Sequence, residues 1–297
     1  MIDAPERSKG FVFAATGEIY TIIARRAARS LRQVHPEAEI DLFTDAPLDD
    51  LVFSQVHQLT SSFFRPKMEA LARSRFDRTV CLDADIMVVG DLDPVFEVLT
   101  QFDIAGCYDR NINADHAMRI HRRPLPAAFP VVNTGVLGVR KSPKVKAFLE
   151  HWQTAVKETN SDRDQPAFRE LLFDSDLRLC TLPPTFNFMT FHELARWWGT
   201  FSAPRVLHSP FLHRTRIEDN DPNTPFTMEE VVGPVYAPKL RAIIHADRNL
   251  TPDVEMSTRV MYDYPVTNPV LIWARKHIRP IFNNIRYAGT SWRHRNR

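Results

Sequence analysis

Two aspartates separated by one residue, Asp83 and Asp85, are the side chains whose type and spacing most directly suggest chemistry in this sequence. They follow an apolar run, residues 79–82, which is typical of a buried strand. Side chains alternate along an extended backbone, so carboxylates at positions i and i+2 should point to the same side. Aspartate oxygens are hard ligands for Mg²⁺ or Mn²⁺, and burying two carboxylates without a cation is costly. The pattern therefore predicts a divalent metal site with coordination positions left for substrate phosphates.

The same aspartates have two other interpretations. In the first, they only cap a turn after the strand. In the second, strand and Asp-x-Asp form the motif of HAD phosphatases, whose first aspartate is a nucleophile. That motif usually opens its fold, whereas here it follows a complete strand–helix–strand unit, and Ile86 replaces the usual threonine or valine. Asp219, Asp221 and Lys239 could supply its other roles only in an order that fits poorly.

The elements before the aspartates are typical of a parallel α/β sheet. Residues 10–16 are an apolar run followed by Gly17, as expected for a buried strand and its loop. Apolar positions then recur every three or four residues over 19–34, which predicts an amphipathic helix that ends before Pro36. Residues 40–44 predict a second strand, so the three elements form a βαβ unit.

A helix over 67–75 should lead into the strand over 79–82, and open α/β sheets bind ligands at the C-terminal ends of their strands. Further strands are predicted at 104–106 and 131–139, and further helices at 143–158 and 165–173. The chain has 22 prolines against 9 glycines, and the prolines become denser after residue 183. The second half should therefore be rich in loops.

The composition favours a globular protein and gives no support to nucleic-acid binding. With 297 residues, 44% of them hydrophobic, the chain can bury a full core. Its 38 basic and 36 acidic residues give a formal charge of only +2. Cys81, Cys107 and Cys180 are widely spaced in apolar surroundings, which is typical of buried thiols in a reducing compartment.

No uncharged apolar run reaches the roughly 20 residues that span a bilayer, and the N-terminus lacks the order of a secretion signal. We therefore expect a cytoplasmic location. From residue 264 to residue 297 there are seven basic residues and no acidic one, among apolar and aromatic positions at near-helical spacing. This pattern predicts peripheral contact with an anionic membrane through 266–297, or else a helix packed on the preceding part of the chain.

Several segments between residues 10 and 215 together resemble glycosyltransferase family 8, the glycogenin and bacterial lipopolysaccharide glycosyltransferase group. The most specific stretch is 66–71 followed by 77–85, which is similar to the family's helix with a donor-contacting lysine, here Lys67, and its strand ending in DxD. Residues 132–137 resemble the family's Asn-Ser-Gly-Val segment, which implies that Asn133 holds donor-sugar hydroxyls. Residues 182–187 resemble its Leu-Pro segment ending in asparagine.

The resemblance implies roles for other donor-site residues. Thr16 and Tyr20 match a threonine and a tyrosine that lie against the nucleobase, and Ala84 belongs to the donor-contacting DxD turn. Asp164 and Gln165 match the family's Asp-Gln pair beside the anomeric carbon of the sugar. Asp164 is also a good helix N-cap, and this structural interpretation stays open.

The family has a third metal ligand, a histidine after a short strand, and a lysine six residues later that meets the diphosphate. His208 fits the histidine, and Arg214 stands at the lysine's position, where its planar fork can grip phosphate oxygens. Phe211 stands where the family has glycine, and the Pro-Trp that follows is missing. His213 and His245 therefore remain alternatives for the ligand.

The resemblance implies a GT-A fold, which is an α/β, Rossmann-like and mostly parallel central sheet flanked by helices, with a loop-rich C-terminal part. Residues 8–250 would form the catalytic domain, with a nucleotide-binding half at 8–110 and a donor-sugar and acceptor half at 111–250. Residues 251–297 would form a basic, partly helical extension.

The implied activity is that of a metal-dependent hexosyltransferase that uses Mn²⁺ or Mg²⁺. It would move a sugar from a nucleotide-diphosphate donor, expected to be a UDP-sugar, to a glycan, a lipid-linked or another hydroxyl acceptor, with retention at the anomeric carbon. The alternative from another class is a nucleotide-sugar-binding protein without turnover.

The segment 109–130 carries a cluster of basic side chains immediately before the predicted donor-binding strand. We expect it to form a loop on the acceptor side, suited to an anionic or phosphorylated acceptor, and a solvated loop is the alternative. The basic residues are Arg110, His116, Arg119, His121, Arg122 and Arg123.

Overall fold

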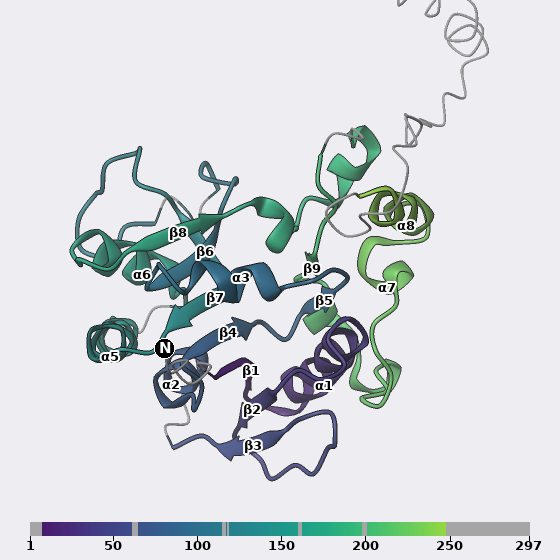
Figure 1. The fold of residues 1–297 in the computed structure, drawn as a ribbon, viewed down its shortest axis with the longest axis horizontal. Coiled ribbons are helices and arrows are strands. Elements are labelled where there is room, and N and C mark those ends of the chain that lie inside the picture. Colours follow the sequence, from purple (N-terminus) through teal and green to yellow (C-terminus); the bar gives the residue numbers. More distant parts are fainter. Residues whose placement is uncertain are drawn as a thin grey trace, which may run out of the picture.

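The computed structural model describes residues 8–60, 65–114, 117, 119–159, 162–197 and 201–247 (Figure 1). The predicted basic extension over 251–297, its membrane-contacting part at 266–297 and His116 all lie outside the described residues. Within the described ranges, no helix has the length and apolar character that a membrane span requires.

A seven-stranded sheet in the order β3-β2-β1-β4-β7-β6-β8 forms the centre of the molecule (Figure 1). Every strand runs parallel to its neighbours except β7, which is antiparallel to both β4 and β6. This arrangement confirms the predicted fold class, a mostly parallel α/β sheet. The strands are β1 (Lys9–Ala15), β2 (Ile40–Thr44), β3 (Gln55–Gln58), β4 (Arg78–Leu82), β6 (Ile104–Tyr108), β7 (Val132–Arg140) and β8 (Leu179–Leu182).

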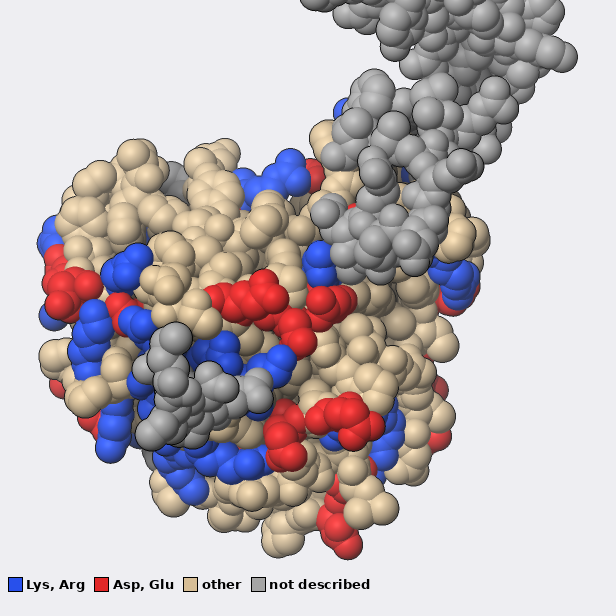
Figure 2. Space-filling model, viewed as in Figure 1, with Lys and Arg blue, Asp and Glu red and all other residues tan. Residues whose placement is uncertain are grey.

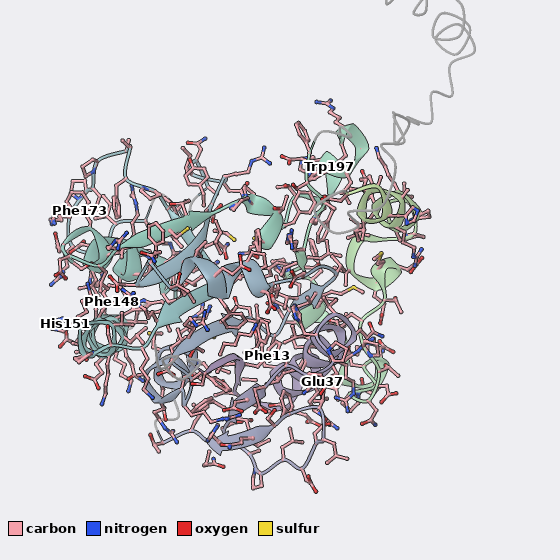
Figure 3. All side chains as sticks on the ribbon, in the orientation of Figure 1. Phe13, Glu37, Phe148, His151, Phe173 and Trp197 are labelled. Carbon is pink, nitrogen blue, oxygen red and sulfur yellow. The ribbon has the colours of Figure 1, made fainter. Side chains whose placement is uncertain are left out.

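Helices cover both faces of this sheet because its strands are apolar on both sides. In β4, Val80 and Leu82 pack with α1 (Glu18–Val34) and α3 (Asp93–Val98), whereas Cys81 packs on the opposite face with α2 (Lys67–Arg73), α5 (Pro143–Glu158) and α6 (Gln165–Phe173). Figure 3 shows Phe13 in the interior near α1, Phe148 on the sheet side of α5 and His151 on its outer side. The sheet is therefore the middle layer of three.

A second, two-stranded sheet pairs β5 (Ile86–Val88) with β9 (Val206–His208) in antiparallel fashion. Beyond β8, the chain consists mainly of loops and short helices, as the prolines predicted. The helices of this part are the 3₁₀ turns η1 (Pro184–Phe186), η2 (Phe191–Arg196), η3 (Leu212–Arg214) and η4 (Ile217–Asp219), followed by α7 (Met228–Val232) and α8 (Ala237–Ala246).

The three cysteines are free thiols, as the sequence predicted. Cys81 and Cys107 are buried and Cys180 is half-buried. Burial raises the pKa of the Cys81 thiol to about 12, so this group stays protonated near neutral pH. On the face shown in Figure 2, acidic and basic side chains both occur, in keeping with the nearly balanced charge.

Candidate active site

The turn between β4 and β5 carries Asp83, Ala84 and Asp85. The pair does not have the extended geometry expected for it, because Ala84 and Asp85 lie in a turn that takes the chain from the central sheet into the two-stranded sheet. The carboxylates nevertheless converge. One oxygen of each aspartate and one ring nitrogen of His208 lie within 4.8 Å of one another.

Strand β9 brings His208 to this turn. His208 pairs with Ile86, the first residue after the aspartates, and its Nε2 lies 3.2 Å from Oδ1 of Asp85. Burial lowers the pKa of His208, but the carboxylate of Asp85 outweighs this effect and raises the pKa above its ordinary value. Burial likewise raises the pKa of Asp85, but its contacts with His208 and His213 hold that pKa well below the usual range. Each group therefore stabilises the charged form of the other.

Two side-chain amides hold the other ring nitrogen of His208. His208 Nδ1 lies 2.8 Å from Asn187 Oδ1, and Asn187 Nδ2 donates to Asn133 Oδ1 at 2.8 Å. The backbone N–H of Gly135 donates to the same Asn133 Oδ1 at 2.9 Å. A backbone N–H can only donate, so it fixes the orientation of Asn133 and, through it, of Asn187. His208 therefore donates through Nδ1, and its Nε2 faces the aspartates.

A bulge in β7, residues 134–136, lies beside the aspartate turn. Gly106 in β6 pairs with Leu137, but the next residue, Cys107, pairs with Asn133, so the bulged residues do not pair with β6. Bulges bend a strand and re-aim its groups, and they are common next to active sites.

The bulge directs backbone groups of β7 into the site. The carbonyl oxygen of Gly135 accepts a hydrogen bond from the Asp83 N–H at 2.9 Å. A Cβ atom at Gly135 would lie 2.6 Å from the His208 ring, so any other residue would displace the histidine. Glycine is therefore required here by the close approach of the ring.

Lys67, the first residue of α2, is the buried cation of the site. Its Nζ lies 2.6 Å from Asp83 Oδ1 and 4.0 Å from Asp164 Oδ2, and it donates to the Thr134 carbonyl at 2.8 Å. Burial lowers the pKa of Lys67, but the carboxylates of Asp83 and Asp164 outweigh burial and raise the pKa above its ordinary value. Lys67 is therefore charged at neutral pH.

Asp164 occupies the N-cap position of α6, where its carbonyl oxygen accepts the N–H of Phe168, but its side chain does not cap the helix. Its side chain makes no cap hydrogen bond, and Pro166 in the first turn has no N–H to donate. The carboxylate faces Lys67 instead, and its Oδ2 is buried with no hydrogen-bond partner in the described part of the chain. A buried acceptor without a partner is costly, and the hydroxyl of a ligand would satisfy it. Gln165 follows it and is half-buried.

Tyr20 and Thr16 lie at the edge of the site. Tyr20, in the first turn of α1, is 43% exposed, and its ring stacks on His213 with centroids 5.9 Å apart. His213 Nδ1 in turn lies 3.4 Å from Asp85 Oδ2. This stack brings Tyr20 next to the aspartates, whereas Thr16 is half-buried in the loop before α1 and has no such link.

Two predicted residues do not join the cluster. Arg214 is exposed, and its guanidinium lies over the ring of Phe211 at 5.3 Å. Among the described residues, it makes no contact with the aspartates. His245 is exposed on α8 and belongs to neither of the two potential metal-binding groups in the described part of the chain. Of the alternative ligands, only His213 is therefore close to Asp85.

Asn133 and Asn187 also line a small hollow together with Tyr108 and Asp109. The Nδ2 group of Asn133 has only long contacts there, 3.5 Å to Asp109 Oδ2 and 3.4 Å to Met189 Sδ, so it can still donate to a ligand. The sequence did not indicate that Asn187 orients a histidine. Its only signal was its place at the end of the resembling Leu-Pro segment.

The donor set at the aspartate turn fits a divalent cation. Mn²⁺ and Mg²⁺ accept carboxylates and imidazoles as ligands. Nε2 of His208 points toward Asp85, so the ring nitrogen and the carboxylates converge on one position. The second nitrogen of that imidazole is hydrogen-bonded, as is usual for histidines that bind metals.

Comparison with known proteins finds a family model and several solved structures to which this chain is similar. The family described as nucleotide-diphospho-sugar transferase matches residues 29–218. A solved active-site mutant of LgtC is 17% identical with a TM-score of 0.47, over 73% of this chain and 84% of that one. The galactosyltransferase LgtC with donor and acceptor sugar analogs is 16% identical with a TM-score of 0.46, over 82% and 100%.

The glycosyltransferase GlyE of Streptococcus pneumoniae TIGR4 is 19% identical with a TM-score of 0.48, over 68% of this chain and 54% of that one. A search of curated proteins finds no match. The family match spans more than half of the chain and includes the aspartate turn, the bulge of β7, Asp164 and His208. The chain belongs to the nucleotide-diphospho-sugar transferase family.

Proposed function

We propose that the protein is a metal-dependent glycosyltransferase that takes a hexose from a UDP-sugar and transfers it, with retention, to the hydroxyl group of a glycan or lipid-linked acceptor. The observation that carries this proposal is the convergence of Asp83, Asp85 and His208 beside the buried Lys67. Membership of the nucleotide-diphospho-sugar transferase family supports it. The family match does not favour the HAD alternative.

In this proposal Asp83, Asp85 and His208 hold Mn²⁺ or Mg²⁺. When bound, such a cation supplies positive charge that stabilises a departing diphosphate. Asn187 holds His208 with Nε2 toward the aspartates, so the ligand is oriented before the metal binds. His213, which contacts the other oxygen of Asp85, is the alternative ligand.

The chain's own residues would bind and position the donor. Lys67 is fixed between Asp83 and Asp164 and would meet the diphosphate with its positive charge. Asp164 Oδ2, which accepts no hydrogen bond from the described residues, would accept one from a sugar hydroxyl, and Asn133 Nδ2 would donate one. Gln165 follows Asp164 and would lie beside the reacting carbon.

The nucleobase would lie against Tyr20, which is exposed at the edge of the site, with Thr16 nearby. Ala84 is buried in the aspartate turn and would contact the donor through its backbone. Arg214 would have to leave the Phe211 ring to reach the diphosphate. In this proposal the nucleotide would lie in the half formed by 8–110, and the sugar and acceptor would lie in the half formed by 111–250. A cytoplasmic location stays part of the proposal.

The experiment is donor hydrolysis without an acceptor, measured as release of UDP from a panel of UDP-sugars with Mn²⁺ and with EDTA. We expect release from at least one UDP-sugar, loss of that release in EDTA and loss in Asp85→Asn. Hydrolysis of a phosphate monoester that depends on Asp83 would instead favour the HAD alternative. Binding of a UDP-sugar without release, in the presence of every acceptor tried, would favour the binding protein.

A further inference from the structure

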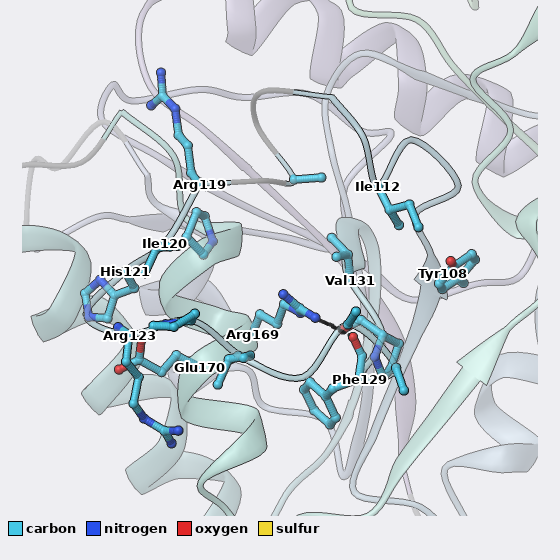
Figure 4. Close-up of a pocket in the computed structure, with 17 residues that line it drawn as sticks. Tyr108, Ile112, Arg119, Ile120, His121, Arg123, Phe129, Val131, Arg169 and Glu170 are labelled. Carbon is cyan, nitrogen blue, oxygen red and sulfur yellow. Dashed lines mark hydrogen bonds between the residues drawn. The ribbon is translucent and has the colours of Figure 1, made fainter.

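A pocket of about 440 Å³ lies between the segment that connects β6 to β7 and the start of α6 (Figure 4). Its volume falls within the range of about 300 to 1,000 Å³ that is usual for small-molecule sites. Most of its wall is apolar. The side chains that matter most here are Ile112, Ile120, Leu125, Phe129, Val131 and Pro166.

The arginines of the 109–130 segment each contact a carboxylate, which compensates part of their charge. The expectation that this segment suits an anionic acceptor stays a prediction. Glu170, which also lines the pocket, accepts from Arg122 Nε at 2.9 Å and from two backbone N–H groups, so its own charge is compensated. The pairs are Arg110–Glu193, Arg119–Asp162, Arg122–Glu170 and Arg123–Asp174.

Arg169 on α6 differs from these arginines. Its guanidinium donates to the carbonyl oxygens of Pro130 (3.3 Å), Pro126 (3.1 Å) and Phe129 (2.6 Å), the last of which Figure 4 shows at the pocket wall. No carboxylate of the described residues pairs with it, and its Nη1 has no hydrogen-bond partner among them. Partial burial lowers the pKa of Arg169, but the group stays charged. Carbonyl dipoles fix its position without cancelling its charge.

The pocket adjoins the candidate active site. Tyr108 lines both this pocket and the small hollow that contains Asn133 and Asn187. Pro166 in the pocket wall follows Gln165 directly in the chain. A ligand in the pocket can therefore present one end to the place where the donor sugar would lie.

We propose that this pocket binds the part of the acceptor that does not react, an apolar group that carries one anionic substituent held by Arg169. The apolar wall selects a hydrocarbon group, and the guanidinium without a carboxylate partner selects a phosphate or carboxylate on it. The inference rests on the proposed transferase function, because it assigns the ligand as an acceptor.

The test uses three probes and isothermal titration calorimetry on the full chain. Hexyl phosphate carries both features of the ligand, hexanol carries only the hydrocarbon, and inorganic phosphate carries only the charge. We expect hexyl phosphate to bind at least roughly tenfold more tightly than either partial probe, since a hydrogen bond to a charged group contributes about that much. Equal affinity for inorganic phosphate and hexyl phosphate would overturn the apolar part of the proposal.

Two variants locate the site. Arg169→Gln should reduce the affinity for hexyl phosphate to that for hexanol, whereas Arg169→Lys should keep part of the preference. The measured quantity is the ratio of the affinity for hexyl phosphate to the affinity for hexanol. This ratio stays unchanged if the variant only loosens the 109–130 segment. Ala128→Trp should fill the pocket and weaken the binding of both probes. The matched controls on α8, Arg241→Gln and Ala242→Trp, should change neither, and unchanged binding in Arg169→Gln and Ala128→Trp would overturn the proposal.

Donor hydrolysis separates the failure of this inference from the failure of the proposed function. If the pocket variants hydrolyse the donor normally and hexyl phosphate does not bind, only the pocket assignment is wrong. If the probes bind as expected and the protein hydrolyses no UDP-sugar, the pocket binds a ligand, but the assignment of that ligand as an acceptor is wrong together with the transferase function.

Discussion

Two groups of one histidine and two aspartates occur in the described part of the chain, and we propose a cation at only one of them. In both groups one ligand atom of each residue lies within 4.8 Å of the others. The residue types are the same, and the two groups differ in which atoms contact their nitrogens and oxygens. The groups are Asp83, Asp85 and His208 at the aspartate turn, and His35, Asp91 and Asp93 at the end of α1.

The group at the end of α1 uses its acceptors to hold its own loop. His35 Nε2 accepts the backbone N–H of Leu92 at 3.0 Å, and Asp91 Oδ1 accepts the N–H of Asp93 at 2.8 Å. Asp93 also pairs with Lys9 at 3.0 Å. Burial lowers the pKa of His35, which favours the neutral ring that this acceptor role needs.

At the aspartate turn the carboxylates of Asp83 and Asp85 contact side-chain cations and rings, namely Lys67, His208 and His213. Asn187 contacts Nδ1 of His208, and Nε2 of that ring faces Asp85. We therefore propose that the cation binds at the aspartate turn, where an amide holds one nitrogen of the histidine and the other nitrogen faces a carboxylate. The predictions below test this difference.

The largest expected effect comes from Asp85→Asn, which should reduce metal-dependent donor hydrolysis to the background rate. The variant removes an anionic ligand but little packing, so its circular dichroism spectrum should match that of the parent. Asp91→Asn is the matched change in the other group and should retain full activity. Equal losses in the two variants would remove the distinction between the groups.

Substituting the lysine beside each group should change the stability of the protein by different amounts. Lys67→Met leaves Asp83 and the buried Asp164 without their cation, so the free energy of unfolding without metal should fall by about 3 to 5 kcal/mol. Lys9→Met breaks an exposed pair and should cost less than about 1 kcal/mol. Urea denaturation measures both values. Adding Mn²⁺ should recover part of the loss in Lys67→Met only, and a Lys9→Met variant that loses as much would contradict the comparison.

Asn187→Leu should weaken Mn²⁺ binding by roughly 10- to 100-fold, as is usual when the partner of a ligating histidine is removed. The free Mn²⁺ signal in electron paramagnetic resonance measures this affinity without any substrate. Asn187→Asp keeps an acceptor for His208 Nδ1 and should recover part of the affinity, which distinguishes orientation from mere packing. His35→Gln should leave the affinity unchanged.

The smallest expected effect is a shift of two histidine pKa values in opposite directions, which NMR of the ring C–H groups can follow. His35 should titrate below its ordinary value of 6.5 and His208 above it. For His35, stability is fully present above about pH 6.5 and is lost as the pH falls toward the lowered folded pKa. For His208, stability is fully present below about pH 6.5 and is lost as the pH rises through the raised folded pKa.

Mn²⁺ competes with the proton on His208, so it should lower the apparent pKa of this histidine and leave that of His35 unchanged. His35→Gln and His208→Gln assign the two signals. A shift of the His35 signal on addition of metal would indicate that the cation binds at the group of His35, which would contradict the proposal.

The sequence predicted the parts of the fold that depend on local patterns. Helices α5 and α6 begin and end at the predicted residues, because long amphipathic repeats define them, and β4 leads into the aspartates as expected. Strands β5 and β9 were not predicted from apolar patterns, since each has only three residues and they pair across more than a hundred positions, as Ile86 and His208 do.

The same limit applies within the candidate site. Sequence order placed His208 ahead of His245, but it could not show that Asn187 orients the ring, because that depends on the bulge that presents the N–H of Gly135. It also placed Arg214 at the diphosphate, whereas its side chain packs on Phe211. Side-chain conformations in the turns after β9 depend on packing between distant segments, which periodicity does not record.

The reversed direction of β7 has an evolutionary consequence. Because β6 runs parallel to β4 and β7 runs opposite to both, the chain leaves β6 and enters β7 at the same edge of the sheet. The segment between them can therefore gain or lose residues without changing the register of the strands that hold Asp83 and Asn133. Under the proposed assignment of this segment to the acceptor, a change in one connection would alter the acceptor and leave the donor site intact.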